Sequence, residues 1–385
     1  YTGPLTAKGV EDTTCYIYNP LISHDEVGDS PSTLGITINA FHRRMQVRME
    51  NTPWSLNASA THDTKRGEDV RARLNVLSRL PYEWQQRVSR WMEHNERFTA
   101  KEANGRIPGV NDEYFMYQSI IGGFPEDMVA SDEWIERLQA YFTKVVREAK
   151  VKSNWESPNE SYEKTCNDFI TNILHDEIFV PEVKTFVEKI TSVSDRHALG
   201  QLLIKVTSPG IPDIYQGCEL WDLSYVDPDN RRPVNYALRK NYFAQINQKE
   251  KEGPETLFRF LQSHRNVGME KLFVTWKSLN FRRNNLQLFL EGTYLPLQVN
   301  GNNQAACVYA RNYKDKWAVV AVSFGTANDA SENEAIDLEE GEPVVLLDRL
   351  PHEWTDLFSG RRISSTGYIP LKELFKDLPL ALLYA

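Results

Sequence analysis

The sequence predicts an α/β protein with a helix-rich body, followed by a smaller antiparallel β domain. Three observations favour this fold class. Apolar residues recur at helical spacing over most of 64–200, a proline-rich motif interrupts that pattern at 203–216, and from about residue 286 the period becomes two. These changes of pattern divide the chain into the segments 1–63, 64–200, 201–283 and 284–385, which we treat as candidate domains or subdomains.

The composition is typical of a globular protein with a sizeable core. Hydrophobic residues make up 41% of the 385 residues and charged residues 25%. The formal net charge of -9 argues against nucleic acid as the main partner, because phosphate binding needs clustered Lys and Arg. No apolar run approaches the roughly 20 residues that a membrane span requires, so no membrane partner is predicted. A neutral or small polar ligand remains open.

The four cysteines, Cys15, Cys166, Cys218 and Cys307, lie far apart in the sequence. None has CxxC or CxxxH spacing, so the sequence predicts neither a metal site nor a disulfide framework. Reduced thiols favour the cytoplasm as the compartment. Because the first residue is Tyr1 and no signal-like region precedes it, we expect the chain to begin inside a longer protein.

The helices and the first strand are predicted from apolar spacing and capping residues. Pro81 fits the first turn of a helix, and Ser131 can accept a hydrogen bond from the N–H groups that begin another helix. A short buried strand is expected at 57–63. The predicted helices lie at about 64–78, from Pro81 onward, at 132–150, at 160–174 and at 181–203. The segment 64–200 is therefore expected to be mostly helical.

The second half of the chain combines a proline-fixed loop, further helices and strands. Two prolines and a glycine exclude a continuing helix at 203–216, where we expect a buried strand leading into a tight loop. Residues 222–236 are loop-like, and helices resume at about 236–283. Candidate strands lie at 286–291, 294–299, 305–311, 316–323, 343–348 and 366–371, with turns at Asn300-Gly301 and Lys314-Asp315.

The first candidate for chemistry is Thr61-His62-Asp63, at the end of the first predicted strand. Its plain interpretation is structural: Asp63 caps the following helix, and His62 is a satisfied core side chain. The functional alternative places both side chains in a pocket at the carboxyl end of a barrel strand, where such barrels carry their chemistry. Taken alone, the pair favours the structural interpretation.

Two further segments change that balance. Ser208–Leu220 alone predicts a structural turn, and Asp227–Asn235 alone predicts a surface loop with ion pairs. In this order, the three segments resemble the closing part of an α-amylase-type (β/α)8 barrel. Four longer blocks are similar to the maltooligosyl trehalose synthase family within that superfamily. These blocks are Ala7–Thr13, Thr61–Arg73, Lys152–Glu160 and Leu220–Pro233.

The resemblance implies the C-terminal part of a (β/α)8 barrel with a large, mostly helical insertion, followed by an antiparallel β domain. Residues 1–63 would run through the seventh strand, 64–200 would be the insertion, and 201–283 would hold the eighth strand and the closing helices. The segment 284–385 would be the β domain. The insertion would either wall the acceptor site or only stabilise the barrel, and we weigh these two alternatives evenly.

The implied function is an isomerase-type intramolecular transglucosylation of maltooligosaccharides, in trehalose biosynthesis. Asp63 would be the third catalytic carboxylate, which stabilises the transition state, and His62 would donate to a sugar hydroxyl. The family's nucleophile lies in a Gly-x-Arg-x-Asp setting, and no such segment or acid/base Glu precedes Thr61 here. We therefore expect this piece to be inactive alone and the N-terminal half of the barrel to belong to the full-length protein. No cofactor and no metal are implied.

The other candidates for sugar contact follow from the same resemblance. Tyr215, Glu219 and Trp221 would lie on the eighth-strand loop, and Asp229 and Arg232 would pair beside the donor subsite. The remaining candidates are Lys65 and, facing the acceptor side, Lys8, Glu11 and Asp12. Two alternatives stay open: another glucan hydrolase or glucanotransferase of the same superfamily, and a non-catalytic α-glucan-binding module.

Overall fold

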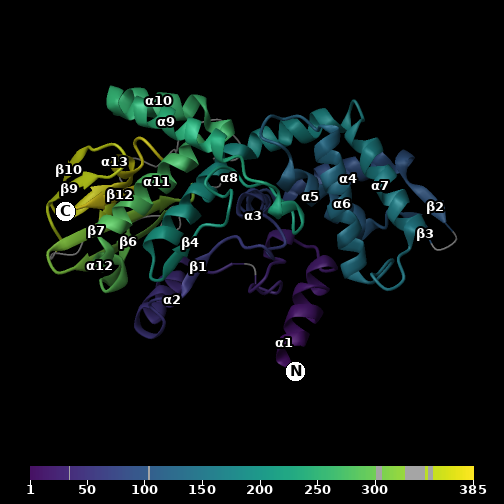
Figure 1. Ribbon diagram of the computed structural model, residues 1–385, viewed down its shortest axis with the longest axis horizontal. Coiled ribbons are helices and arrows are strands. Elements are labelled where there is room, and N and C mark those ends of the chain that lie inside the picture. The colour runs from purple at the N-terminus through teal and green to yellow at the C-terminus, as the bar shows by residue number, and fades with distance from the viewer. Residues whose placement is uncertain (34, 103–104, 301–305, 326–342, 346–349) are drawn as a thin grey trace. The chain divides into compact units, whose positions relative to one another are not determined.

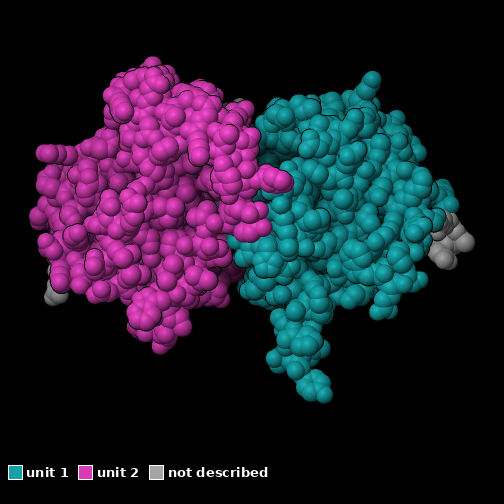
Figure 2. Space-filling view, in the orientation of Figure 1, with its two compact units in different colours: residues 1–34, 60–194, 222–232 teal, residues 35–59, 195–221, 233–385 magenta. Residues whose placement is uncertain are grey.

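The structure is a computed structural model that describes residues 1–33, 35–102, 105–300, 306–325, 343–345 and 350–385. The chain separates into two compact units (Figure 2). Unit 1 comprises residues 1–34, 60–194 and 222–232, and unit 2 comprises residues 35–59, 195–221 and 233–385. These bounds differ from those of the four segments inferred from the sequence, because the chain passes repeatedly from one unit to the other.

Unit 1 is built mainly from helices (Figure 1). Short helical turns lie at Thr2–Pro4 (α1), Leu5–Glu11, Thr14–Tyr16, Ile22–His24, Val76–Arg79, Glu96–Phe98 and Asp229–Arg231. The longer helices are α3 (Glu68–Asn75), α4 (Pro81–Asn95), α5 (Val110–Gly123), α6 (Asp132–Ala149) and α7 (Glu160–Leu174). The strands β2 (Ala100–Glu102) and β3 (Gly105–Ile107) form a small antiparallel pair. The mostly helical character predicted for 64–200 is confirmed.

Helix α6 illustrates why these sequences fold into helices. The side chain of Ser131 accepts a hydrogen bond from the backbone N–H of Trp134, as its position predicts. The helix ends at Lys150, whose φ of 57° is left-handed. Its buried stripe includes Leu138, Tyr141 and Val145, at the spacing of one helix face.

The first predicted strand and the helix after it are both shorter than expected. Strand β1 (Leu56–Ala58) covers only the start of 57–63, and α3 begins at Glu68. Residues 61–67 form a turn instead. Strand β1 pairs in parallel with β4 (Ile211–Asp213). All other strand pairs within the described ranges are antiparallel. This pair is consistent with neighbouring barrel strands, and the complete barrel remains a proposal.

The strand predicted at 203–216 is wrong in its first part. Helix α8 (Phe179–Thr207) continues to Thr207, and only Ile211–Asp213 is extended. Leu203 and Val206 lie in the core of unit 2 as helix side chains, so the apolar run is a buried helix face. The first proline of the motif, Pro209, stands two residues after the last helical residue, where it no longer interrupts a helix.

Unit 2 also contains α2 (Ile38–Asn51), α9 (Tyr236–Glu252), α10 (Pro254–Ser263) and α11 (Met269–Asn284), and the last three confirm the helices predicted at 236–283. The C-terminal strands form an eight-stranded antiparallel sheet in the order β10-β9-β12-β7-β6-β5-β8-β11. These strands are β5 (Thr293–Val299), β6 (Ala306–Tyr313), β7 (Lys316–Ser323), β8 (Pro343–Val345), β9 (Glu353–Asp356), β10 (Arg362–Ser364), β11 (Tyr368–Pro370) and β12 (Leu380–Tyr384). The predicted C-terminal antiparallel sheet is therefore confirmed.

Both faces of this sheet are buried. Alternate side chains of the central strands, such as Tyr309 and Val320, join a core with Leu203 and with Phe273 of α11. The intervening residues, such as Val308, belong to a second core on the other face, with Trp354 and Phe375. The sheet thus shares one core with the helices of unit 2.

Several strand predictions need correction. In place of a strand at 286–291 there is a short helix, α12 (Leu286–Leu290). A short apolar run fits either period, and here the N–H of Gly292 donates to the carbonyl of Gln287, as at the end of a helix. The segment 366–371 is a strand only at 368–370, and helix α13 (Leu371–Leu374) follows. Strands β9, β10 and β12 were not predicted. The turn at Lys314-Asp315 is confirmed, whereas Gly301 and residues 346–348 lie outside the described residues.

All four cysteines are buried, and none forms a disulfide. Burial raises the pKa of the Cys15 thiol to about 12, which keeps it protonated at neutral pH. None of the helices in the described part of the chain is both long and apolar enough to cross a membrane.

The buried guanidinium of Arg282 on α11 closes the end of α8 in unit 2. It donates hydrogen bonds of 2.7 Å to the carbonyl oxygens of Val206 and Gly210. The first of these carbonyls belongs to the last turn of α8, where intrahelical donors are missing. Arg282 therefore fixes the passage from α8 to β4.

Arg282→Met should lower the free energy of unfolding by about 2–4 kcal/mol, because it leaves two buried carbonyls without donors. Urea unfolding followed by circular dichroism measures this change. Its neighbour Arg283 is exposed and serves as the control, so Arg283→Met should change the free energy by less than about 0.5 kcal/mol. Equal losses in the two variants would contradict the assigned contacts.

Candidate functional site

Residues 61–67 form a compact turn that presents the His62-Asp63 pair. The hydroxyl of Thr64 donates to the carbonyl of Thr61 at 3.0 Å, and the backbone N–H of Asp63 donates to the hydroxyl of Thr61 at 3.2 Å. His62 and Asp63 are exposed, and the side chain of Asp63 is 51% exposed. Both side chains are therefore accessible in this chain. His62 is not a buried core side chain, and Asp63 does not cap α3, whose N-cap position is Gly67.

A buried lysine links this turn to the residues predicted for the acceptor side. The ammonium of Lys65 lies 2.8 Å from Asp12 and 3.6 Å from Asp63, while its side chain is only 1% exposed. Asp12 also pairs with Lys8. The neighbouring Glu11 accepts a hydrogen bond from the backbone of Gly28 instead. Four of the predicted residues thus form one chain of alternating charge.

The pKa values of this chain of charges follow from burial and pairing together. Burial alone would lower the pKa of Lys65, but the hydrogen bond and charge of Asp12 raise it above its usual value. Burial would raise the pKa of Asp12, and the hydrogen bonds from Lys65 and Lys8 hold it below its usual value. Both shifts favour the charged pair.

The backbone of the turn is fixed from two sides. The buried carboxylate of Glu26 accepts hydrogen bonds from the N–H groups of Lys65 at 2.7 Å and Arg66 at 3.2 Å. At the other end, the side-chain amide of Asn230 donates to the carbonyl oxygens of Thr61 at 3.3 Å and His62 at 3.2 Å. The exposed pair is therefore carried on a restrained backbone.

The segment 222–232 runs beside this turn. The N–H of Gly67 donates to the carbonyl of Ser224 at 2.8 Å, and Arg66 forms an isolated bridge with Tyr225. A Cβ atom on Gly67 would lie 2.5 Å from the carbonyl oxygen of Asp222, so only glycine fits here. The third motif of the sequence thus packs against the first.

Helix α6 holds 222–232 through three side chains on one helix face. Arg137 donates two hydrogen bonds to the carboxylate of Asp229, at 2.7 and 2.9 Å. Lys144 bonds to the carboxylate of Asp227 at 2.8 Å. Between them, the ring of Tyr141 stacks on a tyrosine of the segment with their centroids 4.5 Å apart. Asp229 also lies 3.1 Å from the guanidinium of Arg232, the pairing that the sequence suggested.

The eighth-strand candidates belong to unit 2. Glu219 pairs with Arg239 of α9. The indole N–H of Trp221 donates to the carbonyl of Arg265 at 2.7 Å. Tyr215 is half-buried. The contacts of Glu219 and Trp221 support a structural role within unit 2, and sugar contact remains a prediction for all three.

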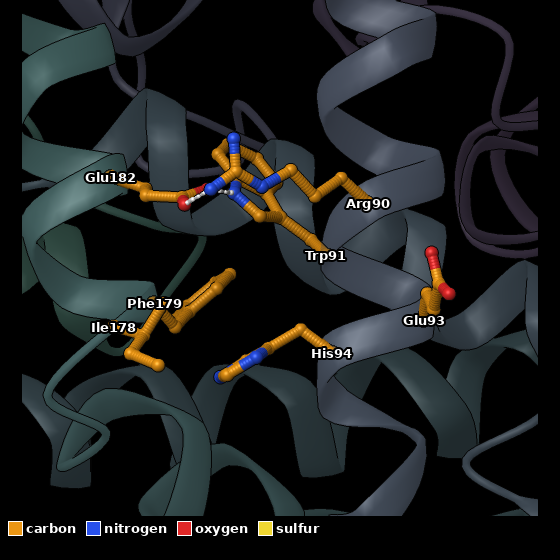
Figure 3. A pocket seen from close by; sticks show the side chains of 7 residues that line it. All are labelled: Arg90, Trp91, Glu93, His94, Ile178, Phe179 and Glu182. Atoms are coloured by element: carbon orange, nitrogen blue, oxygen red, sulfur yellow. Dashed lines mark hydrogen bonds and ion pairs between the residues drawn. The ribbon is translucent and has the colours of Figure 1, made fainter.

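Two pockets of unit 1 lie away from all of these residues. One, of about 370 Å³, lies between α4 and the start of α8 and is lined by Trp91, His94 and Phe179; Figure 3 shows Glu182 of the same pocket bonded to Arg90. The other, of about 560 Å³, has a mostly apolar lining from α4, from Tyr114 of α5 and from the segments 20–24 and 77–78. Within the described ranges, no group of three His, Cys, Asp or Glu side chains is arranged to hold a metal ion.

Comparison with known proteins connects this arrangement with one family. No family model matches the chain. Two proteins of Mycobacterium tuberculosis, provisionally named maltooligosyl trehalose synthase, are 33% identical over 384 residues. The chain resembles the C-terminal half of maltooligosyl trehalose synthases. The match extends over 99% of this chain but over only 44% of the relative, so the chain spans about half the length of these proteins.

Solved structures of such synthases show the same resemblance. The maltooligosyltrehalose synthase of Arthrobacter ramosus superposes with a TM-score of 0.81 at 28% identity, over 99% of this chain and 45% of that one. A Sulfolobus tokodaii protein, described as a hypothetical maltooligosyl trehalose synthase, gives a TM-score of 0.74 at 29% identity, over 100% of this chain and 46% of that one. The chain therefore resembles these synthases in both sequence and fold.

Sequence reasoning missed the residues that fix the site. Glu26, Arg137 and Asn230 touch the turn or its neighbouring segment, and none was a candidate. For Arg137 and Lys144 a signal existed, because their spacing of seven places both on the helix face of Tyr141. Nothing in the sequence indicated which carboxylates they would meet.

Lys65→Met should lower the free energy of unfolding by about 2–4 kcal/mol at pH 7, because Asp12 loses its buried cation. The lowered pKa of Asp12 means that this contribution is present above its usual pKa of 3.8 and is lost as the pH falls through the folded-state value. The raised pKa of Lys65 means that the contribution is also lost at high pH, above 10.5. Urea unfolding at a series of pH values measures both limits.

An exposed lysine–aspartate pair provides the control. Lys164 and Asp168 on α7 are one helical turn apart, with side chains 76% and 58% exposed. Lys164→Met should cost less than about 1 kcal/mol. A loss for Lys65→Met that is no larger, or that does not shrink in acid, would show that the buried pair does not stabilise the fold.

Proposed function

We propose that this chain is the C-terminal half of a maltooligosyl trehalose synthase and carries part of its catalytic site. The observation that carries the proposal is the match to this family over 99% of the chain, together with the Asp63–Lys65–Asp12 charges in its most distinctive block. The substrate is a maltooligosaccharide, an uncharged polar ligand. Four buried cysteines without a disulfide are consistent with a reducing compartment, and we place the protein in the cytoplasm.

The proposed reaction moves a glycosidic bond without using water. A carboxylate nucleophile attacks the anomeric carbon next to the reducing-end glucose, while a carboxylic acid protonates the departing 4-oxygen. The released glucose stays bound and attacks the covalent intermediate through its 1-hydroxyl. The proton of this hydroxyl passes to the residue that acted as the acid, and the nucleophile is released. One α-1,4 bond breaks and one α,α-1,1 bond forms, so the reaction is an isomerisation.

Asp63 and His62 act on the sugar whose anomeric carbon reacts. The Asp63 carboxylate accepts hydrogen bonds from ring hydroxyls, which strengthen as positive charge develops on the sugar. His62 donates to a hydroxyl of the same ring. The buried ammonium of Lys65 lies 3.6 Å from the Asp63 carboxylate and orients it. We assign the nucleophile and the acid to the part of the synthase that this chain does not span.

Incubation with maltopentaose distinguishes the candidate activities. The full-length protein should lower the concentration of reducing ends and release little glucose. A hydrolase would raise the concentration of reducing ends, and a glucan-binding module would leave it unchanged. The isolated 385-residue chain should show no turnover, and clear turnover by it would refute the assignment of the nucleophile and acid to another part of the protein.

Asp63→Asn in the full-length protein should reduce kcat by about 10²–10³-fold, because a neutral amide stabilises the developing charge poorly. The matched control is Asp168→Asn, since that carboxylate on α7 is similarly exposed. A reducing-end assay over a range of maltopentaose concentrations gives kcat for both variants. Wild-type kcat in Asp63→Asn would remove Asp63 from the mechanism.

A further inference from the structure

We propose that Asn230 is a positioning residue for the His62-Asp63 pair and that helix α6 fixes Asn230 through the Arg137–Asp229 ion pair. This inference rests on the proposed function of the pair. It gives the helical segment a specific part in catalysis, beyond stabilising the fold or walling a subsite. All of the residues involved belong to unit 1.

One amide group holds both peptide planes that flank His62. Its Nδ2 donates to the carbonyl of Thr61, in the peptide before His62, and to the carbonyl of His62, in the peptide before Asp63. Two fixed peptide planes determine the φ and ψ of the residue between them. They therefore set the direction in which the His62 side chain leaves the backbone and the point from which Asp63 starts.

Within this chain, which spans about half the length of its relatives, packing does not hold the two side chains, so control of their backbone matters. His62 and Asp63 are exposed, in contrast to Lys65, which is 1% exposed. A solvent-exposed side chain retains several rotamers unless its backbone and partners restrict them. Within this chain the restraint on the pair comes from the turn itself, through Asn230 at one end and Glu26 at the other.

Asn230 is itself held in place. It is buried, and it lies in the short helical turn Asp229–Arg231. Its neighbour Asp229 accepts two hydrogen bonds from Arg137 and a third, of 2.8 Å, from the backbone of Tyr225. Because the side chain of Asp229 is only 10% exposed, this bidentate pair is screened little by water. Helix α6 thus determines where the Asn230 amide lies.

The test measures kcat and KM for maltopentaose in the full-length protein, with the variants Asn230→Ala, Asn230→Asp and Arg137→Leu. Asn230→Asp keeps the shape but removes both N–H donors. We expect kcat to fall by about 10- to 100-fold in each variant, because small misplacements of catalytic groups are costly. KM should change little, and the thermal midpoint should stay above the assay temperature.

One control is another asparagine and the other is another residue of α6, and both donate to residues outside the segment 222–232. Asn167 on α7 donates to the hydroxyl of Thr143, and Gln139 on α6 donates to the backbone of α7 rather than to 222–232. Asn167→Ala and Gln139→Leu should therefore keep wild-type kcat. In addition, Arg137→Leu combined with Asn230→Ala should lower kcat by less than the product of the single effects, because both act through one connection.

Wild-type kcat in Asn230→Ala, equal losses in the controls, or multiplicative effects in the double variant would overturn the inference. If Asn230→Ala does not fold, Asn230→Asp and Arg137→Lys decide the matter by the same criteria, since lysine keeps the charge but not the bidentate geometry. Failure of the proposed function is separate: wild-type protein would then release glucose or do nothing. In the first case the same variants are compared by their hydrolysis rates, and an inactive wild type would overturn both proposals.

Discussion

The candidate site depends on a restrained backbone that carries two exposed side chains. Glu26 binds the N–H groups at one end of the 61–67 turn, and Asn230 binds the carbonyl groups at the other. Carboxylate oxygens accept hydrogen bonds from N–H groups, and an amide nitrogen donates them to carbonyl oxygens, so each residue suits the groups that it meets. His62 and Asp63 stay accessible while their backbone is held, an arrangement that suits a group acting on a bound sugar.

Two groups of charged side chains surround the turn, one in contact with Asp63 and one in contact with the segment 222–232. Lys65 lies buried between Asp12 and Asp63, and it balances the carboxylate that faces solvent. Farther out, Arg137 and Asp229 hold the segment that contains Asn230. Buried pairs of this kind contribute modest net stability, because desolvation offsets much of their attraction. Their larger effect is to specify one geometry, which is what a catalytic pair requires.

Sequence patterns predicted the elements well where one period dominated over a long stretch. The Ser131 cap and the apolar stripe of α6 led to the correct helix, and the change to a period of two, with turn residues between the segments, led to β6 and β7. Short apolar runs failed, because 286–291 and 203–207 fit either period until their neighbours decide. His62, Asp63, Lys65 and Asp12 were named from motifs. Asn230 and Glu26 escaped notice, because a single amide or carboxylate gains its meaning only from the backbone groups that it meets.

The most direct test of the account is amide hydrogen exchange across the 61–67 turn. It compares wild-type protein with Arg137→Leu and with Gln139→Leu, under conditions where all three are folded. We predict that Arg137→Leu speeds the exchange of the Asp63 amide, which donates to Thr61 within the turn, whereas Gln139→Leu leaves it unchanged. Equal protection of this amide in all three proteins would contradict the claim that helix α6 holds the backbone of the site.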